Sequence, residues 1–599
     1  MSGMLGTAVS GLMAFQRSLT TISNNIANAN TEGYSRQRVE LSEAASQYSG
    51  AGFTGSGVQV ANITRSYDDF ISGQLRSSSS AVGDVASYKD YADQVDNLVA
   101  NEDTGVAPAL QSFFNSLNDV ANEPSSLAAR ETMLVQAEAF TYRVGVVGER
   151  LEEIGTQVNA DLQGMTDEIN SYTQAIASLN QRISDNLALS SNSNKQPNDL
   201  LDQRDLALNK LSSLVDVNVA DLGGGKISVM MSNGQPLVTD NRAATLGIQP
   251  SKNDPAQMDI YLIAPGTTAK QVVTDKFKGG EVSGALRFRE ELLEPAQQKL
   301  GAMVAAIAIE FNALHQEGYD YNGNKGEALF SFNNVTEVPV SQVNGTEVAS
   351  VKLEAGLSAI GADSANIDTS DYLLKIVDNG SGGNEYILER IDDGSEITLT
   401  LNTDAADTTA DANGVYGSLV AGASDNLPGI TLNFTTTAGT NSTINVPKIG
   451  DEFFIRPTFT AAKYIQMNIT DAEKVAAATN LDTDGTTVIN GAMIGDNRNM
   501  LKLADLANQS NMFGGTAGFQ ETYGQVVSRV GALTHAADIS VTAQESLLNN
   551  AVEARDAKSG VNLDEEAANL MRYQQAYQAA AQSIAGANQM FNTLLQAVR

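Results

Sequence analysis

Residues 563–598 read LDEEAANLMRYQQAYQAAAQSIAGANQMFNTLLQAV, and after Arg572 this stretch carries no charged side chain. Apolar residues recur in it every seven positions, which is the pattern that helices need to pack along one another. The stretch therefore predicts a helix whose apolar seam faces another helix. The seam comprises Leu563, Leu570, Tyr577, Ile584, Phe591 and Val598, with Ala567, Ala581 and Leu595 between them.

The beginning of the chain has the same pattern. Between Ser2 and Thr31 the only charged side chain is Arg17, and the positions off the seam carry small or uncharged polar residues. A neutral surface of this kind does not repel an identical neighbour, so the two ends together predict a subunit that self-assembles through its terminal helices. The N-terminal seam comprises Leu5, Leu12, Leu19 and Ile26, with Ala8, Phe15, Ile22 and Ala29 in the second position.

A globular-core helix and a membrane span are two other interpretations of these ends. A single apolar helix is often part of a globular core, but two ends that share period and neutrality make this less probable than pairing. A membrane span needs about 20 mostly apolar residues, and glutamine and asparagine interrupt the last helix. Residues 1–30 also lack the basic start and the continuous apolar stretch of a secretory signal. If the protein leaves the cell, it therefore does so by a route that needs no cleaved signal peptide of that type.

Composition limits the function classes. The 599 residues are too many for one core, which predicts several domains. The absence of cysteine excludes disulfides, thiolate metal sites and cysteine nucleophiles. A net charge of −34 without basic clusters argues against nucleic acid and anionic membranes as partners.

The hydrophobic periods predict a mainly α protein with a β insertion, elongated and multi-domain. Paired terminal helices form one part, expected at residues 1–65 and 540–599. A bundle of long helices follows at 66–318 and 461–539, with a small β-meander at about 217–273, and residues 319–460 form an outer β-rich domain. Pairing the ends folds the chain back on itself, so we expect the termini at one pole and the β domain at the other.

One helix of the bundle is predicted in detail. From Leu134 to Leu187, apolar residues follow at steps of three or four, which places a single apolar stripe on a rod of roughly 80 Å. Helices this long are rare in compact domains, which favours an elongated bundle.

No motif for catalysis or for a cofactor was found. The only histidines, His315 and His535, have no second histidine nearby, and phosphate-binding loops and serine elbows are missing. Residues 320–326, DYNGNKG, faintly match a calcium loop, but the glycine is out of place and Ser331 stands where a bidentate glutamate belongs. We therefore predict a protein that is not an enzyme and has no cofactor or metal site.

Two segments resemble a known family. Residues 23–36, SNNIANANTEGYSR, resemble the N-terminal signature shared by bacterial flagellar rod, hook and hook-associated proteins, and residues 562–577, NLDEEAANLMRYQQAY, resemble the matching C-terminal signature. The signature positions are Asn24, Asn25, Asn28, Thr31, Gly33, Tyr34, Tyr573 and Gln574.

Within this axial family, internal motifs are similar to those of members at the hook–filament junction. These are the Tyr-Ser-Arg continuation at 34–36, the segment NDLLDQRD at 198–205, and FNALHQEGYD at 311–320 followed by NGNKG. The resemblance covers most of the chain except about 335–500.

The resemblance implies a structural subunit in a ring between hook and filament, outside the cell, which self-assembles through its terminal helices. The terminal helices would line the inside of a tubular polymer, with long helices as a second layer and the β domain outside. Its partners would be copies of itself, hook protein, a second junction protein and filament protein, and a cytoplasmic chaperone would hold the C-terminal helix before type III export. We also expect that the terminal helices fold only on assembly.

Two alternatives stay open at this stage. One is that the chain is another axial component, such as a hook, distal-rod or filament protein. The other is that it is a surface adhesin or enzyme that acts through the β insertion.

Overall fold

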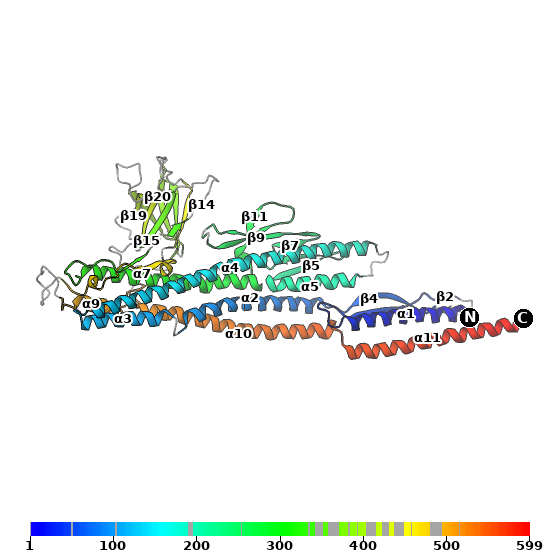
Figure 1. Ribbon diagram of the computed structural model, residues 1–599. Helices are drawn as coiled ribbons and strands as arrows, with labels where there is room; N and C mark the ends of the chain where they lie inside the picture. Colours follow the sequence, from blue (N-terminus) through cyan, green and yellow to red (C-terminus); the bar gives the residue numbers. More distant parts are fainter. Residues whose placement is uncertain are drawn as a thin grey trace.

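The computed structural model is an elongated molecule with both chain ends at one end and a β-sheet domain near the other (Figure 1). The structure describes residues 2–598 except 49–51, 102–104, 190–195, 253, 255, 333–335, 339, 342–350, 358–369, 381–383, 392, 403–414, 422–429, 437–448, 457, 480–493 and 514. The expected arrangement, mainly α with a β insertion, is confirmed.

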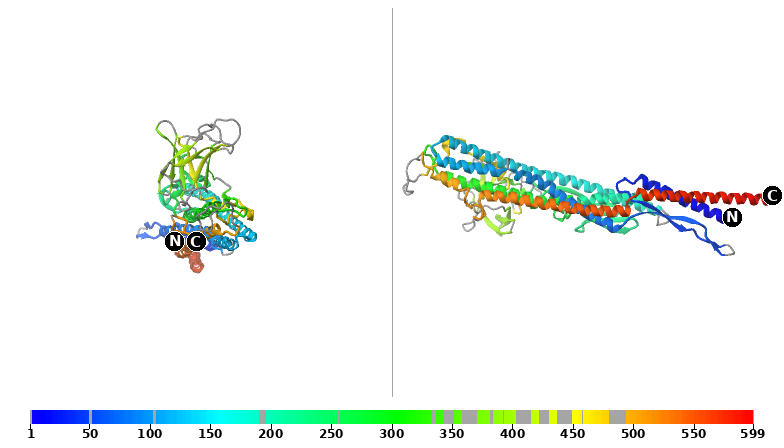
Figure 2. Two further views of the ribbon diagram at one scale, coloured as in Figure 1. Left: turned by 90° about the vertical axis from the view of Figure 1, so that its left-hand side faces the viewer. Right: turned by 90° about the horizontal axis from the view of Figure 1, so that it is seen from below.

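The terminal part consists of two helices and a β-hairpin. Helix α1 spans Ser2–Ala27 and ends at a run of turns before Gly33, as the accumulation of asparagine predicts. Strands β1 (Gln37–Glu43) and β4 (Val58–Arg65) pair antiparallel and lie against α1, and the short pair β2 (Gln47–Tyr48) and β3 (Phe53–Thr54) extends them. The last helix, α11 (Leu563–Val598), lies along α1 (Figure 2).

Long helices form the body of the molecule. They are α2 (Asp69–Val99), α3 (Val106–Asn122), α4 (Leu127–Leu189), α5 (Asn198–Leu214), α6 (Gly280–Phe288), α7 (Glu294–Glu317), α9 (Arg498–Asp505) and α10 (Phe519–Ser559). A π-helical turn at Arg289–Leu293 joins α6 to α7. The 63 residues of α4 correspond to about 95 Å. Most of the predicted stripe between Leu134 and Leu187 is buried, so the rod is confirmed.

Aromatic packing fills the core of this bundle far from the termini. The ring of Phe113 lies 6.0 Å from Phe140, 5.3 Å from Phe311 and 5.9 Å from Phe330, measured between ring centroids. These four side chains are fully buried and come from α3, α4, α7 and the entry to the β insertion. Large apolar residues from distant parts of the sequence therefore fix the bundle.

The predicted β-meander is two small sheets that cover α4. One has the strand order β5 (Val217–Gly223), β6 (Lys226–Met231), β7 (Pro236–Thr239) and β8 (Arg242–Ala243). The other has the order β11 (Lys270–Val272), β10 (Met258–Ile263) and β9 (Thr245–Pro250). All described strand pairs in both sheets are antiparallel.

The β insertion is dominated by a nine-stranded antiparallel sheet. Its order is β13 (Thr336–Val338), β15 (Val351–Leu357), β20 (Ile430–Thr436), β19 (Val415–Ala421), β18 (Glu396–Asn402), β17 (Asn384–Arg390), β16 (Tyr372–Asp378), β21 (Glu452–Ile455) and β14 (Val340–Ser341). The two outermost strands, β13 and β14, follow each other in sequence, so the sheet curves back on itself. Alternate residues of β16, such as Leu374 and Ile376, are buried inside it.

The return from the insertion differs from the prediction of a helix that resumes at Ala461. Helix α8 is a single turn, Ala461–Tyr464, and strand β22 (Ile465–Met467) follows it at once and pairs with β12 (Phe330–Phe332). A 3-10 turn at Ala472–Lys474 comes next. The prediction was wrong because the apolar residues there belong to a two-stranded neck formed by β12 and β22. The pairing of these strands depends on residues more than a hundred positions apart.

Candidate assembly site

The two terminal helices pack antiparallel. Phe15 of α1 lies 6.2 Å from Tyr573 of α11, measured between ring centroids. Ten residues further along α1, the side-chain amide of Asn25 donates to the carboxylate of Glu566, seven residues earlier in α11, at 3.1 Å. The two seams predicted from sequence thus lie on helices that contact each other, with the chain ends pointing the same way.

The buried stripe of α1 lies one position before most of the predicted seam. Its buried residues are mostly small or polar, whereas Leu12 and Leu19 are half-buried and Leu5 and Ile26 are 38% exposed. Small residues allow close approach of the helices, and the larger leucines remain at the edge. Of the predicted second positions, Ala8, Phe15 and Ala29 are half-buried and Ile22 is buried. The buried set is Gly11, Ala14, Ser18, Thr21, Ile22 and Asn25.

The predicted seam of α11 also contains both half-buried and exposed residues. Leu570, Tyr577 and Ile584 are half-buried, whereas Leu563 and Phe591 are 54% and 52% exposed. Of the residues between them, Ala581 is half-buried and Ala567 is exposed. The side chains of Leu595 and Val598 lie outside the described residues. Large apolar side chains of both helices therefore remain available to other molecules.

The N-terminal signature forms a hydrogen-bonded joint around Asn25. The side-chain oxygen of Asn25, Oδ1, accepts from the Tyr34 hydroxyl at 2.8 Å and from the backbone amide of Gln37 at 3.0 Å. Its amide group donates to the Gln37 carbonyl at 2.9 Å as well as to Glu566. Burial, followed by the charges of Asp202 and Glu566, raises the pKa of Tyr34 to about 12, so its hydroxyl remains a donor at neutral pH.

The neighbouring arginine links this joint to α11. Arg36 Nε donates to Glu566 at 2.8 Å, and its two terminal nitrogens bind both oxygens of Glu565 at 3.0 and 2.8 Å. The backbone amide of Arg36 also donates to the carbonyl of Ser559 at 2.8 Å. A two-pronged pairing of this kind sets direction as well as distance. The N- and C-terminal signatures therefore recognise each other directly.

The remaining signature residues shape the turn that brings Tyr34 to Asn25. Asn28 caps the carbonyl of Asn24 at 3.0 Å, and Thr31 donates to the Asn28 side chain at 3.2 Å. Gly33 has a φ of +79°, and a Cβ there would lie 3.0 Å from Leu206 of α5. Gln574 is exposed on α11.

Sequence reasoning did not identify the residues that join the terminal part to the bundle. Asp202 of α5 accepts from the Ser35 amide and from Arg65, each at 3.0 Å, and Arg65 also pairs with Asp205. Asn198 donates to the carbonyl of Ile63 at 2.9 Å. The segment NDLLDQRD at 198–205 carried the signal, since three of its polar residues form this joint.

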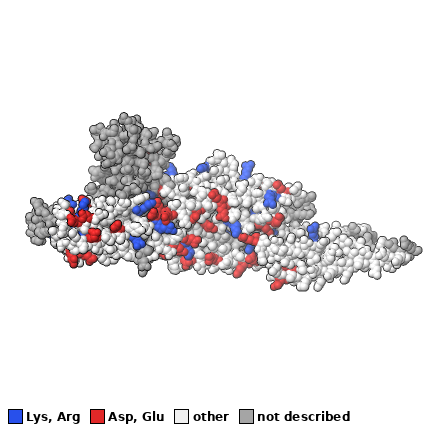
Figure 3. Space-filling model, in the orientation of Figure 1, with Lys and Arg blue, Asp and Glu red and all other residues white. Residues whose placement is uncertain are grey.

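Charge separates the two parts of the surface. Apart from Arg17, helix α1 and the part of α11 after Arg572 carry no charged side chain. Acidic and basic side chains gather instead over the bundle and where the terminal part meets it (Figure 3).

The described residues offer little for catalysis. They contain no group of three or more His, Asp or Glu placed to hold a metal ion. In the calcium-like loop, Asp320 accepts instead from the backbone amides of Asn322 and Asn324, each at 2.8 Å. No described helix is long and apolar enough to cross a membrane.

Comparison with known proteins agrees with both signatures and with the bundle. Residues 5–34 match the family model of the flagella basal body rod protein, and residues 555–597 match that of the flagellar basal body rod FlgEFG protein C-terminal. Residues 92–330 match the flagellar hook-associated protein FlgK helical domain. Flagellar hook-associated protein 1 of Salmonella typhimurium is 32% identical over 597 residues, covering 99% of this chain and 100% of the relative. The chain belongs to the flagellar hook-associated protein 1 family.

Other members of the hook-associated protein 1 family agree. The Escherichia coli protein is 30% identical over 99% of this chain and 100% of the relative, and the Bacillus subtilis protein is 28% identical over 61% and 75%. The flagellar hook junction protein FlgK from Burkholderia pseudomallei has the same fold, with a TM-score of 0.63 and 24% identity over 81% of this chain and 100% of that one. Family membership makes the chain a structural component of the flagellum outside the cell, associated with other axial proteins, and not an enzyme.

Proposed function

We propose that copies of this chain form a ring at the junction between the hook and the filament, and that α1 and α11 line the inside of the ring as a coiled-coil-like pair. The observation that carries this proposal is the surface of the terminal helices. Apart from Arg17, α1 and the part of α11 after Arg572 are uncharged, and the two helices expose large apolar side chains such as Leu5, Ile26 and Phe591 that find no cover within the described part of the subunit. Burying them against neighbouring subunits would stabilise a polymer.

The proposed interface residues are the predicted seam positions of both helices. Those that are half-buried, such as Leu570 and Tyr577, contribute to the pairing within a subunit, and the exposed ones meet other subunits. The signature joint around Asn25 and Arg36 would hold the pair at a fixed angle to the bundle, because it connects α1, α11 and α5 through hydrogen bonds and ion pairs.

The three expected domains follow from the same division. The terminal part would form the inner layer, the bundle a second layer, and the sheet domain of residues 319–460 the outer surface. We place the boundary between inner and second layers at Gly560 rather than at 540, because α10 continues unbroken to Ser559.

The proposed partners are hook protein on one side, and a second junction protein and filament protein on the other. Before export by the type III route, α11 would rest in the groove of a cytoplasmic chaperone. An amphipathic helix with an exposed apolar face is the form of ligand that such grooves accept.

The test is electron microscopy of cells that produce Phe591→Asp in place of the natural chain, with an assay for filament protein in the medium. Phe591 is exposed in the subunit, so the subunit itself should fold. In the ring, the carboxylate introduced at position 591 would be buried without a partner, which costs on the order of several kcal/mol per subunit. Complete hooks without filaments, with filament protein in the medium, are expected. Leu570→Asp should act similarly.

The matched control is Ser171→Asp, which adds the same charge at an exposed position of α4. It should assemble normally. Normal filaments with Phe591→Asp would refute the proposed inner layer, and cells without the chain that also lack hooks would make it a rod or hook component. Deletion of residues 335–455 should leave assembly intact, whereas an adhesin or enzyme would lose its activity.

A further inference from the structure

The sheet domain joins the bundle through a two-stranded neck. Strand β12 enters the insertion and β22 leaves it, and the two pair antiparallel. Asn312 of α7 holds the entry with both ends of its side-chain amide. It donates to the carbonyl of Phe330 at 2.8 Å and accepts from the Phe330 amide at 2.9 Å. The two crossings into the insertion are thus fixed beside each other on α7.

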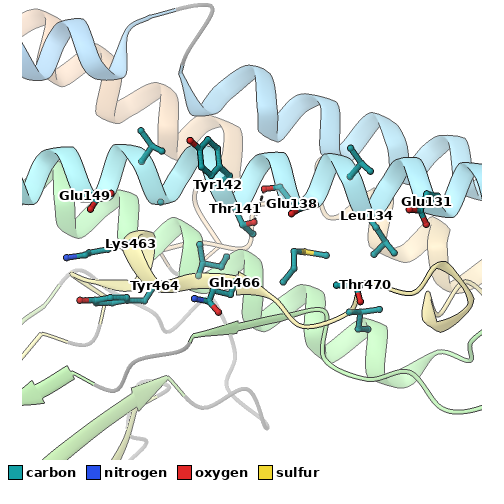
Figure 4. Close-up of a pocket in the computed structure, with 16 residues that line it drawn as sticks. Glu131, Leu134, Glu138, Thr141, Tyr142, Glu149, Lys463, Tyr464, Gln466 and Thr470 are labelled. Atoms are coloured by element: carbon teal, nitrogen blue, oxygen red, sulfur yellow. Dashed lines mark hydrogen bonds between the residues drawn. The ribbon is translucent and has the colours of Figure 1, made fainter.

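The exit segment packs closely between α7 and α4, because glycines on both helices leave room for its backbone. A Cβ at Gly301 of α7 would lie 1.8 Å from the carbonyl oxygen of Thr458, and a Cβ at Gly148 of α4 would lie 2.9 Å from the amide nitrogen of Lys463. Both contacts are closer than any side chain would permit. Lys463 and Tyr464 lie beside α4, along a groove of about 600 Å³ (Figure 4).

Arg456 stands at this exit and contacts carboxylates from three parts of the chain. Its guanidinium lies 2.7 Å from Asp254, in the loop between β9 and β10, and 3.2 Å from Asp371, at the start of β16. Glu294, the first residue of α7, is 3.8 Å away. The guanidinium also stacks over the ring of Phe459 at 3.6 Å. Arg456 is only 7% exposed.

The carboxylates around Arg456 come from both the body of the molecule and the sheet domain. Asp254 and Glu294 belong to the body of the molecule, whereas Asp371 belongs to the sheet domain, and Arg456 directly follows β21 of that domain. Burial raises the pKa of Asp371 to about 6, although Arg456 lowers it. Without the guanidinium, three carboxylates would face one another with little water to separate them.

We infer that Arg456 is the residue that fixes the direction in which the sheet domain projects, so that sheet and bundle move as one body. Nη1 of Arg456 donates a hydrogen bond to Asp254 of the body, and Nε and Nη2 form ion pairs with Asp371 and Glu294. A planar guanidinium can face all three carboxylates in a fixed orientation, which a flexible ammonium would not do. The inference concerns contacts within one subunit and is independent of the ring proposed above.

The test measures the distance between the two parts by pulsed electron paramagnetic resonance on the full chain. Because the chain has no cysteine, spin labels attach only where cysteine is introduced. Ser171→Cys in α4 and Thr398→Cys in β18 are both exposed sites. The otherwise natural chain should give one narrow distance distribution. Arg456→Met should broaden or shift it while circular dichroism stays unchanged.

The control is Arg390→Met. Arg390 lies in β17 and pairs with Ser370 and Asp393, all within the insertion, so the distribution should stay narrow and in place. Should Arg456→Met fail to fold, Arg456→Lys keeps the charge and should still broaden the distribution. A broad distribution in the otherwise natural chain overturns the inference, as does an unchanged one in a folded Arg456 variant.

Discussion

The bundle and the terminal pair bury different kinds of side chain. The core of the bundle consists of large side chains such as Phe113 and Phe311, which are fully buried. In the terminal pair, α1 buries Gly11, Ala14 and Ser18, and large residues such as Phe591 remain exposed. The bundle thus has a core of large side chains, although Phe70 and Leu189 remain at its surface, whereas the terminal pair has a core of small ones and leaves large side chains exposed. The difference separates residues that stabilise the subunit from residues that would stabilise the assembly.

The largest effect on the subunit is expected from Phe113→Ala. The change removes a ring that packs on four other aromatic side chains and leaves a cavity, which typically costs about 3–5 kcal/mol. Urea unfolding of the monomer measures this loss. Phe591→Ala is the control and should change the free energy of unfolding by less than about 0.5 kcal/mol. Equal losses for the two variants would contradict the comparison.

A second effect comes from acid, and in the bundle its source is His315. His315 is fully buried, and its Nε2 accepts from the amide of Ala476 at 2.9 Å, so Nδ1 carries the proton that is donated to the Glu327 carbonyl. Burial lowers the pKa of His315 from 6.5 to about 4. Below pH 6.5 the unfolded chain therefore binds a proton that the folded chain does not, and stability falls as the pH falls.

The expected loss from His315 reaches about 3 kcal/mol near pH 4. It is measured by urea unfolding between pH 7 and pH 4, in the natural chain and in His315→Gln. The variant should lose less stability over the same interval. Parallel pH profiles would show that His315 does not titrate as described.

The third prediction concerns the joint around Asn25 within the terminal part. Asn25→Ala leaves the hydroxyl of Tyr34 and a carboxylate oxygen of Glu566 without this partner, at a cost of about 1–3 kcal/mol. The loss should appear as faster amide exchange in α1 and α11, with the exchange of α4 unchanged. This prediction requires that α1 and α11 are folded in the free subunit, so protection of amides 5–30 and 570–598 in the natural chain would refute the expectation that they fold only on assembly. Without such protection Asn25→Ala would leave the exchange of both helices unchanged.

The smallest effect is expected from Gly33→Ala. Gly33 has a positive φ, and the new methyl group would approach Leu206 closely, which together cost about 1–2 kcal/mol. The same exchange measurement should report it in the terminal helices. Gly164→Ala is a useful control because a Cβ there has open space and a helical backbone, so exchange should stay the same or slow slightly.

The sequence predicted the elements whose signal is local. The three- and four-residue steps from Leu134 to Leu187 identified α4, and the asparagine-rich stretch after Ala27 identified the end of α1. The signatures identified the family but did not predict that their residues meet in one joint. Helix α8 was misjudged because the local pattern around Ala461 does not reveal its distant partner strand.

By itself, the sequence determined the neutral terminal helices, the long rod, the position of the β insertion and the family, because period, charge and motif are properties of neighbouring residues. The tertiary structure alone decided which face of α1 meets α11, how Asn25 and Arg36 reach Glu566, and how Arg456 gathers three carboxylates. These contacts join residues hundreds of positions apart. Their energies depend on distance, angle and burial, which only the folded chain defines.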